Sequence, residues 1–424
     1  MRTAALSALV LLAAGSARAQ FVQYTAPGSL AEEQVPTKDR LKAAMDEATY
    51  HLGPLQVAPW LALKDVAYVN NVYATATDLQ SDVTATLGAG AQAYLPLGHS
   101  MTLGMYALPE YVWWHDLSNR RGWNGAVGAG LFGYFNQMTV EVQAGGSRTQ
   151  QYASSEVEVP VNLEDKRVSA LVEVQVMGKL SLFARGGVDQ WRYNQRGLTP
   201  DLASQLILLD RDEKRAGGGV RYHFTKTISL GLGVEQYTTD FVHPENPQSN
   251  SGSAPIAELS VKAGHLSVNV NATALDLKPN EVSKFVPYSG TNGGFRVGFR
   301  PAGRLEFEYY GGRNLVYSVE QGVSYYLDQR TGIAVQSELG WRATGRIFLE
   351  TGHDDYVFES AGTAGRTDDL RAYGVTFNIR LGRVASLAVG GDRTDYTSTV
   401  AGYDRSVTQV RTGLQFSSGK AQWW

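Results

Sequence analysis

Two short groups of residues have the types that cofactor or catalytic sites use. Gly128-Ala129-Gly130-Leu131-Phe132-Gly133 matches the glycine pattern of a dinucleotide-binding loop, and His353-Asp354-Asp355 could ligate a metal or serve a hydrolase. The glycine pattern needs a helix N-terminus for the pyrophosphate, but here it lies inside an alternating, strand-like segment. The seven histidines are scattered singly, so His353 has no second cluster beside it in the sequence. We therefore predict no catalytic, cofactor-binding or metal-binding residue.

Charged side chains also recur at alternate positions within apolar segments. In the segment from Tyr373 to Gly391, apolar residues of one parity alternate with polar ones such as Asn378 and Arg380. Unpaired burial of such charges in a dry core or in lipid would cost about several kcal/mol each, so the polar parity predicts a wet interior and the apolar parity a lipid face. The two signs nearly balance, which argues against a pore selective for one of them. The predicted pore-lining residues are Arg185, Arg221, Glu235, Glu258, Lys262, Arg296, Arg300, Glu306, Glu308, Tyr310, Asn378, Arg380 and Arg411.

The elements that carry these side chains are predicted strands joined by connections of two lengths. Eight short turns, such as Asn136-Gln137 and Thr225-Lys226, alternate with nine longer polar loops, which requires eighteen strands. Short turns at one end and long loops at the other are typical of a bacterial outer-membrane barrel. The predicted fold is all-β, a transmembrane antiparallel up-and-down β-barrel of about 18 strands with a short N-terminal helix.

The chain divides into four predicted parts. Residues 1–19 combine Arg2, an apolar run and Ala17-Arg18-Ala19, the pattern of a secretory signal peptide. Residues 20–52 form a periplasmic arm, in which Thr37 caps a short helix whose apolar face could serve as a plug, a lid or a simple docking surface. The barrel takes residues 53–416, and residues 417–424 form a C-terminal tail.

Bulk composition excludes several classes of protein. The 424 residues contain no cysteine, and a net charge of −3 leaves no basic excess to hold a nucleic acid. Beyond the signal peptide no apolar stretch reaches about 18 residues, which excludes a helical inner-membrane protein. We expect the outer membrane as the location, its lipid as a partner, and no nucleic acid; the oligomeric state is not specified by the sequence.

The segment from Leu52 to Gly98 resembles the opening of a family of outer-membrane β-barrel porins, the second family of that name. The resemblance is carried by Gly53-Pro54-Leu55, Pro59-Trp60, Tyr68-Val69-Asn70-Asn71-Val72 and Ser81-Asp82, and it continues to Phe416 only as a pattern of turns and strands. It implies a channel without catalytic residues or cofactors. For some members it implies export of exopolysaccharide together with a periplasmic polysaccharide-export protein.

These observations predict a passive outer-membrane channel rather than an enzyme. Passage of exopolysaccharide is the leading hypothesis, because the family implies it and the predicted lumen charge is nearly neutral. A general diffusion porin and a purely structural barrel are the alternatives. A barrel enzyme that recruits loop residues is the least favoured, since a fold alone does not specify its function.

Overall fold

The computed structural model describes residues 27–28, 37–73, 79–152, 156, 160–194, 198, 200–280, 283–340, 342–360, 365–382 and 385–417. The predicted signal peptide, residues 1–19, lies outside the described residues. So does the predicted tail, residues 417–424, except for Ser417.

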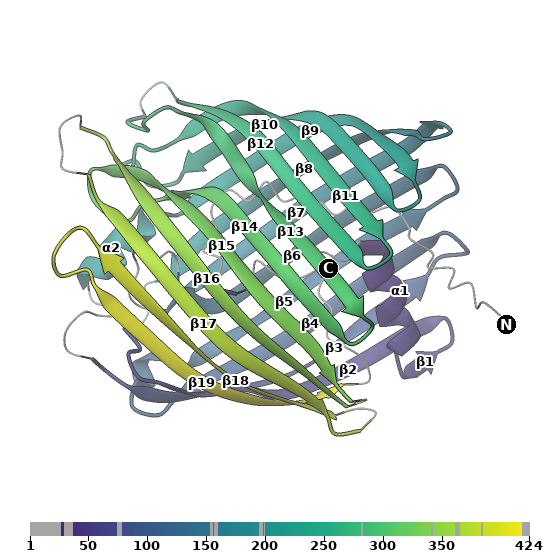
Figure 1. Ribbon diagram of the computed structural model, residues 1–424, viewed down its shortest axis with the longest axis horizontal. Coiled ribbons are helices and arrows are strands. Elements are labelled where there is room, and N and C mark those ends of the chain that lie inside the picture. The colour runs from purple at the N-terminus through teal and green to yellow at the C-terminus, as the bar shows by residue number, and fades with distance from the viewer. Residues whose placement is uncertain are drawn as a thin grey trace.

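Eighteen antiparallel strands form one closed ring, in which each strand pairs with its neighbour in the sequence and β19 pairs with β2 (Figure 1). The prediction of an all-β antiparallel barrel of about 18 strands with a short N-terminal helix is therefore confirmed. The strands are β2 (Leu55–Val69), β3 (Asp82–Pro96), β4 (Met101–Trp114), β5 (Gly122–Tyr134), β6 (Met138–Tyr152), β7 (Pro160–Met177), β8 (Leu180–Asn194), β9 (Arg211–Thr225), β10 (Ile228–Phe241), β11 (Asn250–Ala263), β12 (Leu266–Pro279), β13 (Tyr288–Ala302), β14 (Leu305–Tyr317), β15 (Val323–Leu339), β16 (Ala343–Phe358), β17 (Thr367–Arg380), β18 (Ala385–Ser398) and β19 (Arg405–Ser417).

Within the described residues, four short elements accompany the ring. Helix α1 (Thr37–Glu47) is the predicted N-terminal helix, and β1 (Tyr50–Leu52) forms a small hairpin with the first residues of β2. A 3₁₀ turn, η2 (Ser118–Arg120), and helix α2 (Pro200–Ile207) lie in loops. Neither β1 nor α2 is predicted from the sequence, because elements of three and eight residues are too short for a periodic pattern to stand out.

The two faces of the strands differ sharply in exposure. On β10, Val234 is 50% exposed whereas the adjacent Glu235 is 1% exposed, and the same alternation recurs around the ring. Large apolar side chains on the outside of a closed barrel form a surface that only lipid covers well. This apolar belt and the barrel fold place the protein in an outer membrane. Within the described part of the chain, no helix has the length and apolar character needed to cross a membrane.

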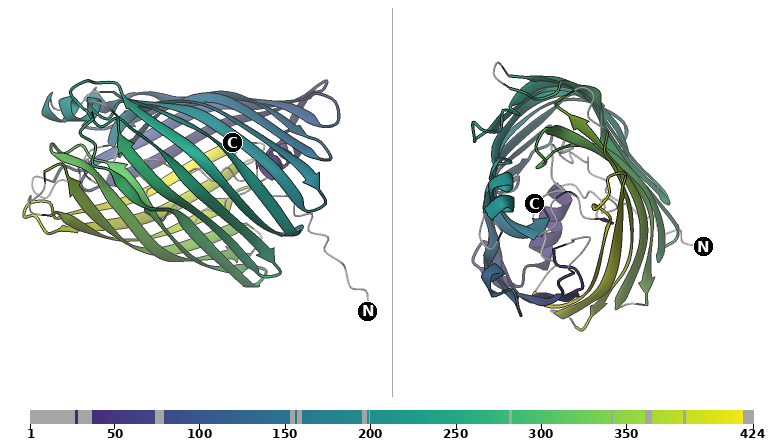
Figure 2. Two further views of the ribbon diagram at one scale, coloured as in Figure 1. Left: turned by 90° about the horizontal axis from the view of Figure 1, so that it is seen from above. Right: turned by 90° about the vertical axis from the view of Figure 1, so that its left-hand side faces the viewer.

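Helix α1 lies inside the ring (Figure 2). Its buried residues Leu41 and Ala44, together with Ala48 just after the helix, contact Tyr94 of β3 and Phe132 of β5, both near short turns. Because these contacts belong to the buried parity of the strands, that parity faces the lumen.

The opposite end of the lumen, where the long loops lie, is narrowed by a large apolar cluster. We call it the mouth cluster; it joins α2 and the loop-side ends of the strands from β7 to β16. It consists of Val161, Leu163, Trp191, Tyr193, Leu206, Leu209, Tyr237, Ala254, Leu275, Leu277, Phe285, Tyr288, Leu315, Val316, Tyr317, Val323, Tyr325, Tyr326 and Tyr356.

Candidate channel interior

The first group of predicted pore-lining residues forms an ion-pair network across five neighbouring strands. Glu258 of β11 accepts hydrogen bonds from Arg185 Nη1 of β8 at 2.6 Å and from Arg221 Nη2 of β9 at 2.8 Å. Arg185 also pairs with Glu235 of β10, and Arg221 pairs with Glu173 of β7. Side chains at the same height on adjacent strands lie close enough to form ion pairs. Their positive and negative charges largely cancel, so the network is a largely neutral patch on the lumen wall.

A second network lies farther along the ring on β13 and β14, separated from the first by β12. Arg296 of β13 contacts Glu306 at 3.0 Å and also pairs with Glu308, both of β14. Glu306 pairs in addition with Arg300, whose side chain is half exposed at the short-turn end. Each buried carboxylate of this network thus has a guanidinium partner, because an unpaired charge is costly to bury.

The remaining predicted residues occupy different environments. Lys262 of β11 acts electrostatically on Asp39 of α1, and Arg411 lies 3.4 Å from Asp392 on the neighbouring strand. Asn378 and Arg380 are exposed at the short-turn end of β17. Tyr310 is fully buried against Ala334, Phe348 and Leu370, where the absence of a side chain at Gly332 leaves room for its ring. For all of these residues, lining a water-filled path stays a prediction.

The N-terminal arm contacts two different walls of the lumen; a plug, a lid or a docked arm was predicted, but not the partners that hold it. The backbone N–H of Gly28 donates to Glu350 Oε2 at 2.8 Å, and Arg346 Nη2 donates to the Gly28 carbonyl at 2.8 Å, both from β16. Gly28 has a φ of 80° and its Cα faces the Phe348 ring, which a Cβ would meet at 2.8 Å. Only glycine satisfies both conditions easily.

Helix α1 is held on the wall made by β3, β5 and β6. Besides the apolar contacts of Leu41, the Lys38 ammonium lies 5.1 Å from the centre of the Tyr134 ring. Thr37 hydrogen-bonds the Glu141 carboxylate, and Arg40 interacts with the same group. The alternating pattern of the strands gives no signal for this docking, because it depends on the closure of the ring.

The hairpin of β14 and β15 folds into the mouth at the loop end. Tyr317, at the end of β14, accepts a hydrogen bond from Asn250 Nδ2 of β11 at 2.9 Å. Its ring lies edge-on to Phe241 at 5.0 Å and under the Arg211 guanidinium at 5.5 Å. These contacts skip over β12 and β13, so the hairpin tip crosses part of the lumen and narrows it.

Glu156, between β6 and β7, reaches the same hairpin from the far side of the ring. Its carboxylate accepts hydrogen bonds from Ser318 Oγ at 2.5 Å and from the Val319 N–H at 2.9 Å. The strand order puts β6 and β14 at nearly opposite positions. The contact therefore spans the outer mouth.

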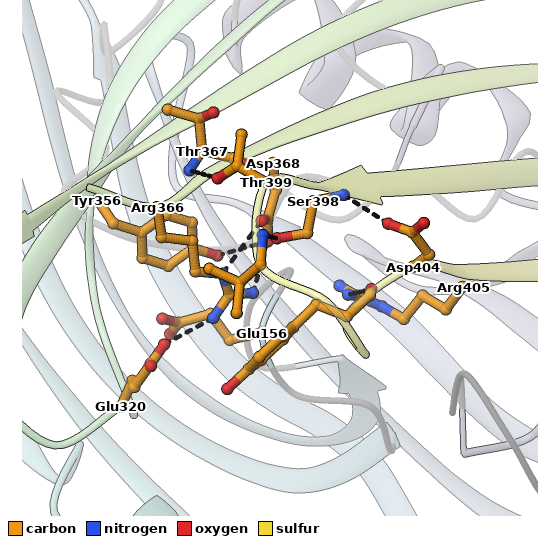
Figure 3. Close-up of polar contacts among 12 residues, drawn as sticks. Glu156, Glu320, Tyr356, Arg366, Thr367, Asp368, Ser398, Thr399, Asp404 and Arg405 are labelled. Atoms are coloured by element: carbon orange, nitrogen blue, oxygen red, sulfur yellow. Dashed lines mark hydrogen bonds and ion pairs between the residues drawn. The ribbon is translucent and has the colours of Figure 1, made fainter. Parts of the chain in front are cut away.

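Arg366, just before β17, holds the loops around this contact together (Figure 3). Its guanidinium donates to Glu320 at 2.6 Å and to Asp368 at 2.6 Å. It also stacks on Tyr356 at 4.3 Å and on Tyr403 at 3.9 Å from the ring centres. With an exposed fraction of 3%, it is the central cation of a buried loop cluster.

The two motifs that could have supported catalysis have structural explanations. Gly128 to Gly133 lies within β5, as predicted, and its glycines make room for the Tyr106 and Phe132 rings. His353 faces outward and contacts Asp369 at 2.8 Å and Asp355 at 2.9 Å. Among the described residues, no group of three or more acidic or histidine side chains is arranged to hold a metal ion.

No protein-family model and no curated protein matches the sequence. The resemblance of Leu52 to Gly98 to one porin family, and the link to polysaccharide export, therefore stay hypotheses.

Solved structures, in contrast, share the fold. Pseudomonas aeruginosa OpdK with vanillate covers 85% of this chain and 98% of its own, with a TM-score of 0.51 and 13% identity. Pseudomonas aeruginosa OccK2 (OpdF) in complex with glucuronate covers 87% and 100%, with a TM-score of 0.52 and 10% identity. A BenF-like porin from Pseudomonas fluorescens Pf-5 covers 86% and 99%, with a TM-score of 0.52 and 12% identity. The chain thus has the 18-stranded barrel fold of outer-membrane porins.

Proposed function

We propose that the protein is a passive channel for small polar solutes across the outer membrane. The observation that carries the proposal is the charged inner wall of a closed ring, in which Glu258 joins Arg185 and Arg221. A barrel of this strand number is wide enough for an aqueous channel, and paired charges offer hydrogen bonds to a passing solute without trapping it. Nothing in this mechanism needs a cofactor or a catalytic residue.

Small solutes are favoured over exopolysaccharide because both ends of the lumen are narrowed. Helix α1 occupies the short-turn end, and the mouth cluster with the β14–β15 hairpin covers part of the loop end. A polymer would need both obstructions to move, whereas a solute the size of a monosaccharide needs much less space. Two neighbours of the same fold were solved with small carboxylates, OpdK with vanillate and OccK2 (OpdF) with glucuronate. Polysaccharide export with a periplasmic partner is the second candidate.

Swelling of liposomes that contain the refolded protein tests the proposal. We expect swelling with arabinose, glucose and glucuronate, slower swelling with trisaccharides, and none with dextran. A difference in gel mobility between unheated and boiled protein would confirm that the barrel is folded. Entry of dextran would favour the polysaccharide channel, and a folded protein that admits no solute at all would favour a structural barrel.

The outer mouth is expected to loosen as pH rises. Burial raises the pKa of Glu156 from 4.5 to about 7, although hydrogen bonds from Ser318 and Val319 and the nearby Arg366 charge oppose the shift. Because this pKa is raised above its unfolded value, the Glu156 contact is fully stabilising below about pH 4.5 and is weakened as pH rises through about 7. Glucuronate and glucose permeation should therefore both increase between about pH 5 and pH 8.

The variant Glu156→Gln provides the matched control. A neutral amide of the same shape keeps its hydrogen-bonding capacity and cannot ionise, so the pH dependence of glucose permeation should disappear. If the Gln variant keeps the pH dependence of the wild-type protein, Glu156 is not its source.

A further inference from the structure

The outward face of the barrel carries a groove in addition to the lumen. It has a volume of about 810 Å³ and is lined by β12 to β17 at the level where the apolar belt ends. The lining includes Phe295, Arg313, Thr331, Thr351, His353 and Arg371. All six belong to the outward parity of their strands, whereas Asn292 and Arg330 in the same lining belong to the lumen parity, so the groove opens mainly toward the membrane at a place where the wall parts.

The groove exists because the wall bends inward at β14. Pairing of β13 with β14 stops at Gly293 and Arg313, whereas β14 pairs with β15 as far as Tyr317. The upper part of β14 thus leaves β13 and packs into the mouth. Gly293, Gly294 and Gly312 line the floor where the two strands part, and the missing side chains leave the groove deep.

Strand register arranges the outward side chains into three parallel rows. Tyr309, Ile333, Leu349 and Tyr373 are consecutive cross-strand partners and form an apolar row. The next row toward the loops holds Thr331, Thr351 and Arg371, and the third holds Arg313, Gln329, His353 and Asp369. The chemical groups of a lipid follow the same order along its length: acyl chains come first, then esters or hydroxyls, and then a charged headgroup.

Two guanidinium groups that line the groove have no ion-pair partner among the described residues: Arg313 in the third row and Arg371 in the second. Nε of Arg313 is shielded from solvent and has no hydrogen-bond partner within the described chain. The carboxylates nearby are already engaged: His353 contacts Asp369 and Asp355, and Arg393 contacts Asp395 at 2.8 Å. Outward arginines on other strands are paired, as Arg148 is with Glu164 and Arg192 with Asp212 at 2.6 Å. An anion is therefore the missing partner in the groove.

We propose that this groove binds an outer-leaflet lipid with a phosphorylated headgroup. The phosphate lies in the groove between Arg313 of β14 and Arg371 of β17, which supply charged hydrogen-bond donors from its two sides. The threonine hydroxyls meet the sugar or ester oxygens, and the acyl chains lie along Phe295 and the apolar row. The site is on the outside of the wall and does not depend on the channel activity.

Native mass spectrometry of the full mature chain in non-ionic detergent micelles tests this site. Diphosphoryl lipid A should bind, phosphatidylcholine should bind much more weakly, and millimolar inorganic phosphate should not compete. The double variant R313Q/R371Q should lose at least about tenfold in lipid A affinity, because each charged hydrogen bond to phosphate contributes substantially. A gel-mobility comparison of unheated and boiled samples would confirm that the variant is folded.

A second double variant, R148Q/R192Q, is the matched control. It removes the same charge from the outward faces of β6 and β8, where Arg192 pairs with Asp212 and Arg148 with Glu164, and should bind lipid A as the wild-type protein does. Equal losses in the two double variants would overturn the site, since general charge would then explain binding. Competition by inorganic phosphate would point to a free-anion site instead. A change of oligomeric mass in R313Q/R371Q without loss of lipid A would identify the groove as a contact with a second copy.

Discussion

Deletion of residues 20–49 is expected to raise the single-channel conductance by at least about twofold, because it removes the helix from a lumen that is otherwise wide enough for water. The ring itself should persist, since β2 to β19 pair with one another without α1. Planar-bilayer recording measures the conductance. The same deletion should also speed liposome swelling by trisaccharides.

Point substitutions in α1 distinguish the effect of releasing the helix from the wall from the effect of deleting residues 20–49. Leu41 is buried against the wall, so Leu41→Asp places a charge in an apolar contact and should release the helix. Lys42 is on the exposed face of the same helix, where its pair with Asp46 contributes little, so Lys42→Ala should conduct like the wild-type protein. Equal conductance for the deletion, Leu41→Asp and the wild-type protein would show that α1 does not restrict the channel.

Arg366→Leu is expected to lower the free energy of unfolding by about 3–5 kcal/mol, because it leaves the buried Asp368 carboxylate without its cation. Glu320 loses its partner as well, and the stacking on Tyr356 is lost. Urea-induced unfolding in detergent, followed by tryptophan fluorescence, measures the change.

Arg393→Leu is a closely matched control. Arg393 pairs with Asp395 two residues later, as Arg366 does with Asp368, but both groups are roughly half exposed. The loss of such an exposed pair should cost at most about 1 kcal/mol. If Arg366→Leu and Arg393→Leu lower the free energy of unfolding equally, burial of the Arg366 cluster does not add to stability. Limited proteolysis within residues 359–366 should also be faster in Arg366→Leu only.

The outer wall of the barrel could be predicted almost completely from the sequence. Val234 and Glu235 differ in exposure as their parity requires, and the same rule separates Tyr373 from Ala372 on β17. Alternation of short turns with long loops was enough for the strand number. Both signals are local, since they depend only on residues that are neighbours in the chain.

The partners of the lumen charges could not be predicted, although their parity could. Glu258 pairs with Arg185 and Arg221 because strands β8 to β11 align in one particular register, and a shift of two residues would preserve the pattern while changing every pair. The burial of the Tyr310 ring could not be predicted from parity either. Its parity is that of the lumen, but a glycine on the next strand lets its ring lie flat and buried.

Fold class, strand count, membrane face and the absence of a helical span thus followed from periodicity, which each segment carries in its own residues. The docking of Gly28 on β16 and the reach of Glu156 to the β14–β15 hairpin follow from closure of the ring, and the groove beside Arg313 follows from the parting of β13 and β14. Closure brings together residues that are more than a hundred positions apart in the chain, and no spacing within a strand records which of them will meet.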